Sequence, residues 1–197
     1  IYASGIVPRF SPDDFVAEAG DDHGFKPDVV IKDGDVFSGP SWTLEAVFTP
    51  GHTSDHMCLA LRQENALFSG DHIMGWSTTV VSPPDGDMDA YLASLDKVQA
   101  RDFATLWPTH GPPVTDVRPF IQTYIDHRLA REAQIIVQLR AGKTRIMDMV
   151  PVMYADVDAR LYPAAAHSVL AHLLRLVKAG RVRCESPGVE SNFSFVG

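Results

Sequence analysis

The sequence predicts an α/β domain followed by a smaller helical domain that ends in a β-hairpin. Short apolar segments bounded by turns are typical of strands, and they occur at residues 42–48, 57–61, 66–68 and 105–107. A Gly-Pro-Pro sequence at residues 111–113 interrupts regular secondary structure after the last of these segments, and helical periodicity dominates from residue 116 onward. We therefore expect two domains, residues 1–115 and residues 116–197.

Local patterns predict the elements of the first domain. Apolar residues on both sides of Asp33-Gly34 predict a hairpin over residues 27–37. Residues 42–48 alternate between apolar and polar side chains and should form a strand with one buried face, whereas the apolar residues 57–61 should form a buried strand. A helix is expected to begin at Asp87 or Asp89, because either side chain can cap the first turn.

The second domain should begin with a long helix between Asp116, a good helix cap, and Gly142, a good helix terminator. Apolar residues spaced by three or four predict its buried face: Val117, Ile121, Ile125, Leu129, Ala133 and Ile136. A short helix over residues 145–149 should stop at Pro151, and a third helix should occupy residues 163–180. Strand-like residues then follow, so three helices closed by a hairpin describe a winged-helix arrangement.

The charge is distributed unevenly along this 197-residue chain. The formal net charge is −8, with −11 over residues 1–125 and +3 over residues 126–197. An acidic chain is a poor general binder of nucleic acid, because affinity for phosphate comes from clustered cations. The local exception is a group of basic residues near the C-terminus, made up of Arg175, Lys178, Arg181 and Arg183. Such groups more often form a solvated surface than a binding site for nucleic acid. The histidines at positions 127, 167 and 172 are likewise expected on helix surfaces.

Composition and cysteine usage indicate an ordinary folded protein of the cytoplasm. Hydrophobic residues make up 45% of the chain and charged residues 21%. No apolar run approaches the ~18 residues that span a bilayer, so we expect no membrane partner. Cys58 and Cys184 stand alone without metal-ligand or disulfide spacing, which fits a reducing compartment.

Three side chains of metal-ligand type follow predicted strands, each on a tight turn. His52 follows a Thr-Pro-Gly turn, Asp71 a Ser-Gly turn and His110 a Pro-Thr turn. Glycine and proline fix the direction of such turns, and strands that end at one edge of a sheet would bring the three side chains together. Imidazole and carboxylate are ligands for zinc, iron or manganese. One histidine in such a turn is usually an ordinary surface residue, so the hypothesis depends on the three together.

The segments around these residues resemble motifs of the metallo-β-lactamase superfamily. Thr49–His56 resembles its Gly-His-Thr-x-x-His segment, Ser69–His72 its Gly-Asp segment, and Pro108–Pro112 its Gly/Thr-His-Gly-Pro segment. The three occur in family order, with the ligand-type residues 19 and 39 positions apart. Over about residues 27–183 the chain is most similar to the branch with a C-terminal winged-helix domain, which includes lactamase-like endoribonucleases.

The resemblance implies an αββα sandwich with two divalent metal ions, expected to be zinc, along one edge. It implies that His52 binds the first ion, that Asp71 bridges both ions and that His110 binds the second. His56 matches a family histidine that binds no metal, so we expect it to support the ligands from behind. His72 matches no ligand and is expected to be an ordinary loop residue.

Two further residues are candidates for substrate contact. Trp76 and Thr78 follow the Asp71 turn, and the resemblance implies that this segment faces the entrance of the site. The equally weighted alternative is an ordinary loop with one buried tryptophan. The sequence identifies no catalytic residue apart from the candidate metal ligands.

The chain departs from the family in its first motif, because the sequence His-x-His-x-Asp-His is absent. His23 is the only histidine before His52, and no His-x-His precedes it. Since the first residue is Ile rather than Met, we expect the C-terminal part of a longer protein, with a sandwich incomplete at its N-terminus. Metal binding by this chain alone should then be weak or absent, and the chain alone should be inactive.

The resemblance implies a hydrolase in which a metal-activated water attacks an ester, thioester, lactam or phosphodiester. The substrate would accordingly be a small molecule or a nucleic acid. The absence of any serine or cysteine nucleophile motif agrees with this chemistry. The alternative is a non-catalytic binding module, a degenerate sandwich plus winged helix that contacts a protein or a nucleic acid.

Overall fold

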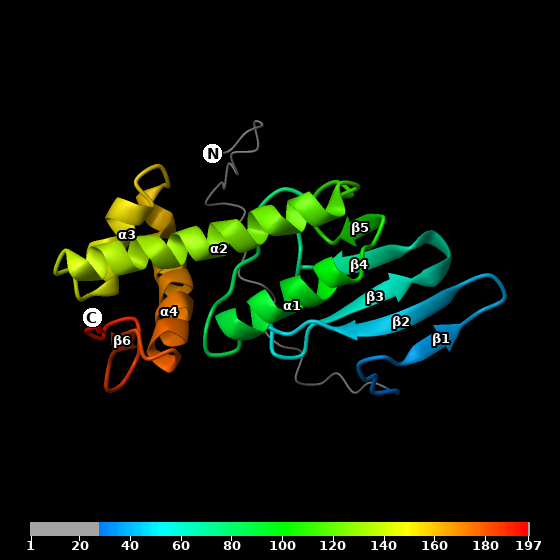
Figure 1. Ribbon diagram of the computed structural model, residues 1–197, viewed down its shortest axis with the longest axis horizontal. Helices are drawn as coiled ribbons and strands as arrows, with labels where there is room; N and C mark the ends of the chain where they lie inside the picture. Colours follow the sequence, from blue (N-terminus) through cyan, green and yellow to red (C-terminus); the bar gives the residue numbers. More distant parts are fainter. Residues whose placement is uncertain (1–27, 197) are drawn as a thin grey trace.

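The computed structural model describes residues 28–196 and contains a five-stranded sheet with two helices on one face (Figure 1). The strands lie in chain order across the sheet: β1 (Val36–Ser38), β2 (Thr43–Phe48), β3 (Met57–Leu61), β4 (Ala66–Gly70) and β5 (Thr105–Pro108). The first four pair antiparallel, whereas β5 is parallel to β4. Helix α1 (Met88–Ala100) makes the crossover that a parallel pair requires.

The two faces of the sheet differ in what covers them. Side chains such as Val47 and Leu67 point toward α1 and the helix after β5, and they form one core with Leu95. On the other face Phe68 and Trp107 are paired in register, yet they are 44% and 43% exposed. The described residues thus form one sheet and one helical layer of the expected αββα sandwich.

The rest of the chain forms three helices and a two-stranded hairpin, as expected (Figure 1). The elements are α2 (Val117–Arg140), α3 (Ile146–Met153), α4 (Tyr162–Lys178), β6 (Val182–Arg183) and β7 (Ser194–Phe195), with short 3-10 turns at Arg62–Glu64 and Ala159–Leu161. Between residues 28 and 196, no helix is long and apolar enough to cross a membrane.

Helix α2 packs in two hydrophobic cores. Its first half contributes Ile121 and Tyr124 to the core beneath the sheet. Its second half contributes Ile135 and Leu139 to a separate core with α3 and α4. The predicted domain boundary at residue 115 remains a proposal, because the helix that follows it serves both cores.

Several local predictions were wrong, each for a physical reason. The Asp33-Gly34 turn exists, but β1 pairs with β2, because the Gly34 N–H donates to the Ala46 carbonyl at 2.8 Å. Leu129 is 46% exposed, since the buried face of α2 includes the polar residues Arg128 and Glu132.

The helix-stop prediction at proline was also wrong. Pro151 lies inside α3 rather than at its end. The Tyr154 N–H donates to the Val150 carbonyl at 2.9 Å, so helical hydrogen bonding continues past the proline. Pro151 has no N–H to donate to the carbonyl four residues earlier, and α3 ends two residues later, at Met153.

Candidate metal-binding site

The sheet topology places the three predicted metal ligands at the same edge. Because β3 is antiparallel to both β2 and β4, and β5 is parallel to β4, the strands β2, β4 and β5 run in one direction. His52, Asp71 and His110 follow the carboxyl ends of these strands. His110 Nε2 lies 3.7 Å from Asp71 Oδ1, and both His52 and Asp71 act electrostatically on His56.

The Asp71 carboxylate has a buried oxygen without a hydrogen-bond partner among the described residues. This oxygen, Oδ1, faces His110 at 3.7 Å, which is too long for a hydrogen bond. A buried and unsatisfied carboxylate oxygen is costly unless a cation approaches it. The position therefore fits an acidic metal ligand.

His52 is held in a form that suits metal binding. Its Nδ1 lies 2.7 Å from the Val80 carbonyl oxygen. A carbonyl can only accept, so Nδ1 carries the hydrogen, and in the neutral ring Nε2 then has the free lone pair. Metal-binding histidines commonly donate one ring N–H to a carbonyl in this way while the other nitrogen binds the ion.

His56 lies behind this edge. Its Nδ1 is 2.8 Å from Thr49 Oγ1, and that hydroxyl is 3.2 Å from Cys58 Sγ. Burial lowers the pKa of His56, and the charge of His52 lowers it further. The turn before Asp71 also packs on this ring, since a Cβ at Gly70 would lie 2.8 Å from His56 Nε2. These contacts agree with a supporting role, which remains a prediction.

His72 is buried in the core rather than placed as an ordinary loop residue. Its ring centroid lies 5.0 Å from that of Tyr91 and 5.8 Å from that of His56. Burial lowers the pKa of His72 to about 3, so the ring is neutral at physiological pH. Sequence reasoning missed this residue because no periodic pattern covers the turn after β4.

A single loop touches all three candidate ligands, and we call residues 74–80 the strap loop. The Gly75 N–H donates to the His110 carbonyl at 2.8 Å. The Thr79 hydroxyl donates to the Asp71 carbonyl at 2.6 Å, and Val80 accepts from His52. The strap loop therefore fixes the backbone or ring of each candidate ligand, and no local sequence pattern predicts these contacts.

The candidate substrate residues lie on the strap loop. Trp76 is 42% exposed, and its ring centroid is 6.5 Å from that of His110. Thr78 is half-buried two positions further along. An exposed aromatic ring beside the candidate ligands is suited to line an apolar substrate. Contact of Trp76 and Thr78 with substrate remains a proposal.

The donors fit a divalent metal in type but do not complete a site by themselves. Among residues 28–196, no group of three or more His, Cys, Asp or Glu side chains is arranged to hold an ion. His23, the remaining upstream histidine, lies outside the described residues. The described part of the chain thus supplies an incomplete set of ligands.

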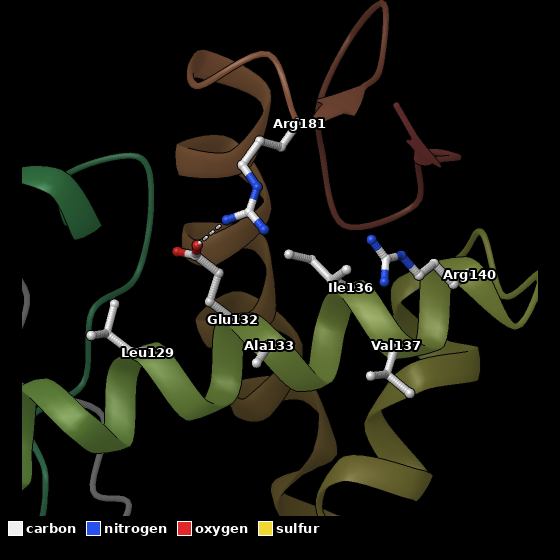
Figure 2. A pocket seen from close by; sticks show the side chains of 7 residues that line it. All are labelled: Leu129, Glu132, Ala133, Ile136, Val137, Arg140 and Arg181. Atoms are coloured by element: carbon white, nitrogen blue, oxygen red, sulfur yellow. Dashed lines mark hydrogen bonds and ion pairs between the residues drawn. The ribbon is translucent and has the colours of Figure 1, made fainter. Parts of the chain in front are cut away.

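A hollow near the second core lies away from these donors (Figure 2). This groove of about 320 Å³ runs along α2 and is lined by Leu129, Glu132, Ala133, Ile136, Val137, Arg140 and Arg181. Glu132 and Arg181 form an ion pair with a separation of 3.1 Å. Figure 2 marks this pair with a dashed line. None of its lining residues is a candidate ligand, so the groove is separate from the metal-binding edge.

The basic group near the C-terminus is largely engaged within the protein. Arg175 pairs with both Asp89 and Glu132, and Lys178 pairs with Asp89 at 3.1 Å. Arg181 pairs with Glu132. These internal ion pairs reduce the positive charge available to phosphate, which disfavours the nucleic-acid alternative.

The surface placement of the helix histidines was correct for only one of them. His167 is exposed, His127 is half-buried and His172 is buried. His172 lies on the inner face of α4, where burial lowers its pKa to about 3. Apolar periodicity does not identify a buried histidine, because the imidazole ring has no clear apolar signature.

We expect Gly75→Ala to destabilise the protein by about 1–3 kcal/mol, because an added Cβ would overpack this backbone contact. The Cβ would lie 2.2 Å from the Pro112 carbonyl oxygen, so the strap loop has to move away from His110. Urea unfolding measures the loss. The matched control is Gly188→Ala, whose Cβ meets only Ser191 Oγ at 3.6 Å. Equal stability of the two variants would show that the close approach at Gly75 is unimportant.

Comparisons with known protein families cover both parts of the chain. Residues 3–110 match the family described as the metallo-beta-lactamase superfamily. Residues 146–188 match the beta-lactamase associated winged helix domain, which confirms the winged-helix prediction. The segment between these two matches contains α2.

Individual proteins agree with these matches. The chain is 36% identical to a beta-lactamase-like protein 2 homolog from Caenorhabditis elegans, over 89% of this chain and 58% of the relative. It is 32% identical to an atrochrysone carboxyl ACP thioesterase from Paecilomyces divaricatus, over 88% and 57%. A crystal structure of a beta-lactamase domain protein from Burkholderia ambifaria superposes with a TM-score of 0.75 at 26% identity, over 84% of this chain and 52% of that one. The chain therefore spans little more than half the length of these proteins.

Proposed function

The chain belongs to the metallo-beta-lactamase superfamily, and on this premise we propose that the complete protein is a metal-dependent hydrolase of thioesters. The observation that carries the proposal is the gathering of His52, Asp71 and His110 at one sheet edge, with His110 3.7 Å from an unsatisfied carboxylate oxygen. Further ligands would come from outside the described residues.

The described residues would have different roles in metal and substrate binding. His52 would offer Nε2 as a ligand while its Nδ1–H stays on Val80, and Asp71 and His110 would offer the other donors. Divalent ions, when bound, supply an activated water and a positive charge for the oxyanion that forms. Trp76 would hold the apolar part of the substrate beside His110.

A thioester is the substrate class that the comparisons favour. The relative from Paecilomyces divaricatus is named an ACP thioesterase. A thioester also has an electrophilic carbonyl that an activated water can attack without a protein nucleophile. The exposed ring of Trp76 suits an acyl chain better than a phosphodiester, which would seek cations. Zinc is the metal that we propose, because the donors are imidazole and carboxylate.

The test is hydrolysis of an acyl thioester by the complete protein, which is monitored through the release of the free thiol. We expect activity that a chelator abolishes and that added zinc restores. A protein that hydrolyses the thioester equally well after complete metal removal would contradict the metal dependence. A protein that holds zinc but leaves thioesters intact, while it cleaves a lactam or a phosphodiester, would contradict the substrate class.

The chain of residues 1–197 should retain little metal after dialysis, whereas the complete protein should retain it. The reason is that a catalytic zinc ordinarily has three protein ligands of its own, and the described donors do not supply three to one ion. Elemental analysis after dialysis gives the metal content of both proteins. Two tightly held ions per 197-residue chain would show that other residues complete the site.

A further inference from the structure

Helix α2 reaches the candidate site from the far side of the strap loop. The Tyr124 hydroxyl lies 2.6 Å from the Met74 carbonyl and also donates toward the Ser77 carbonyl. One turn later, Arg128 donates from its guanidinium to the Thr79 carbonyl. Both ends of the strap loop are therefore attached to the same helix.

Arg128 is an unusual residue at this position because it is only 3% exposed. Its guanidinium carbon lies 5.2 Å from the ring centroid of Tyr91, and no ion pair joins it to any described carboxylate. Burial of an arginine is costly, and the contacts that offset the cost here are a carbonyl and an aromatic face. The charge is thus directed at the strap loop rather than at an acidic partner.

The peptide that Arg128 holds is connected to two candidate ligands. The buried Thr79 donates its hydroxyl to the Asp71 carbonyl at 2.6 Å, which ties down the turn that carries the carboxylate. The next residue, Val80, accepts from His52 Nδ1 at 2.7 Å, which fixes the tautomer and direction of that ring. Movement of the Thr79-Val80 peptide would disturb both ligands together.

We propose that Arg128 is a positioning residue, which acts through Thr79-Val80 to hold the His52 ring and the Asp71 turn in their ligand geometry. The importance of that geometry rests on the proposed function, but the geometry itself exists without metal or substrate. The helix that leads into the winged-helix domain would then be part of the support of the metal-binding edge.

The chain offers a matched control on the same helix. Arg131 also donates to a backbone carbonyl, that of Met153 at 2.6 Å, and its guanidinium lies 4.3 Å from the ring centroid of Tyr154. It makes the same two kinds of contact as Arg128 but touches no part of the strap loop. Arg128→Met and Arg131→Met therefore differ in what the lost contacts support.

The first experiment measures the His52 tautomer by ¹⁵N NMR in the metal-free complete protein. We expect His52 to carry its hydrogen on Nδ1 in the parent and in Arg131→Met, and to become a mixture of tautomers in Arg128→Met. A purely structural role would lower the stability of both variants without moving the tautomer. An unchanged His52 tautomer in a folded Arg128→Met protein would overturn the proposal.

The second experiment measures zinc affinity by competition with a chelator. We expect Arg128→Met to weaken zinc binding by about 10–100-fold, the effect typical of residues that orient metal ligands. Thr79→Val should weaken zinc binding through Asp71 but leave the His52 tautomer intact, because its carbonyl still binds Arg128. Thr79→Val also keeps the side-chain volume, so it serves if Arg128→Met does not fold, and unaltered zinc affinity in it would contradict the link to Asp71.

These readouts separate the two proposals. Failure of the proposed function would appear as no thioester hydrolysis, or no zinc binding, in the parent protein. Failure of the positioning role would appear as an unchanged tautomer in Arg128→Met and unchanged zinc affinity in Thr79→Val, in a parent that binds zinc.

Discussion

Asp71→Asn should lower kcat/KM for thioester hydrolysis by at least about 100-fold in the complete protein, more than loss of a residue that only orients a ligand. Asparagine has nearly the same shape, but it lacks the negative charge of the carboxylate, which would hold the proposed metal ions. Among the described residues, the Asp71 carboxylate is the one that pairs with the His110 ring, at 3.7 Å from its Nε2. Zinc content measured on the same samples should fall with activity.

The same substitution should not reduce the stability of the metal-free protein. Oδ1 of Asp71 is buried without a hydrogen-bond partner among the described residues, so the substitution removes no hydrogen bond of this oxygen. The exposed carboxylate of Asp55, close to the same edge, offers a control, and Asp55→Asn should leave activity within a few-fold of the parent. Full activity of Asp71→Asn would exclude Asp71 as a metal ligand.

His172 should make the protein sensitive to acid. The folded-state pKa of this histidine is lowered to about 3 by burial, and further by Arg128, His127 and Arg175. The unfolded-state pKa is about 6.5. Between these two pH values only the unfolded chain binds the extra proton. The free energy of unfolding therefore falls by about 1.4 kcal/mol for each unit by which the pH is lowered. Stability is unaffected by this group above pH ~6.5 and should be lower by about 2 kcal/mol at pH 5.

His172→Leu should remove this part of the acid sensitivity. Both ring nitrogens of His172 are buried without hydrogen-bond partners among the described residues, so an apolar side chain leaves no donor or acceptor unsatisfied. We expect the variant to gain about 2 kcal/mol over the parent at pH 5 and much less at pH 7.5. His167→Leu, at an exposed position of the same helix, should follow the parent at both pH values. Urea unfolding at the two pH values measures the free energy of unfolding of each protein. An equal loss of stability between pH 7.5 and pH 5 in the parent and in His172→Leu would contradict this prediction.

Local sequence patterns predicted those elements whose stability is local. The strand at residues 57–61 was confirmed with the same bounds. Of the two candidate helix caps, Asp87 and Asp89, the structure uses Asp87, which accepts from the Ala90 N–H at 2.9 Å. The turns that carry the three candidate ligands were recognisable, because glycine and proline there are next to residues of metal-ligand type.

The features that sequence reasoning missed depend on contacts between distant segments. Arg128 and Glu132 turn the buried face of α2 away from the apolar pattern, since their partners lie on the strap loop and on α4. The role of Thr79 depends on a hydroxyl meeting a carbonyl eight positions earlier in a folded loop. No periodicity or motif records such contacts, because each involves one polar atom placed by the tertiary fold.

The double use of α2 limits how these proteins can exchange their C-terminal parts. A helix of 24 residues is about 36 Å long, and Ile121 near its start belongs to the sheet core while Leu139 near its end belongs to the winged-helix core. A chimera joined near residue 115 would bring foreign side chains beneath the sheet and behind the strap loop. A junction after Arg140 would leave that packing intact and would instead place a foreign winged helix against Ile135 and Leu139 of the leading helix.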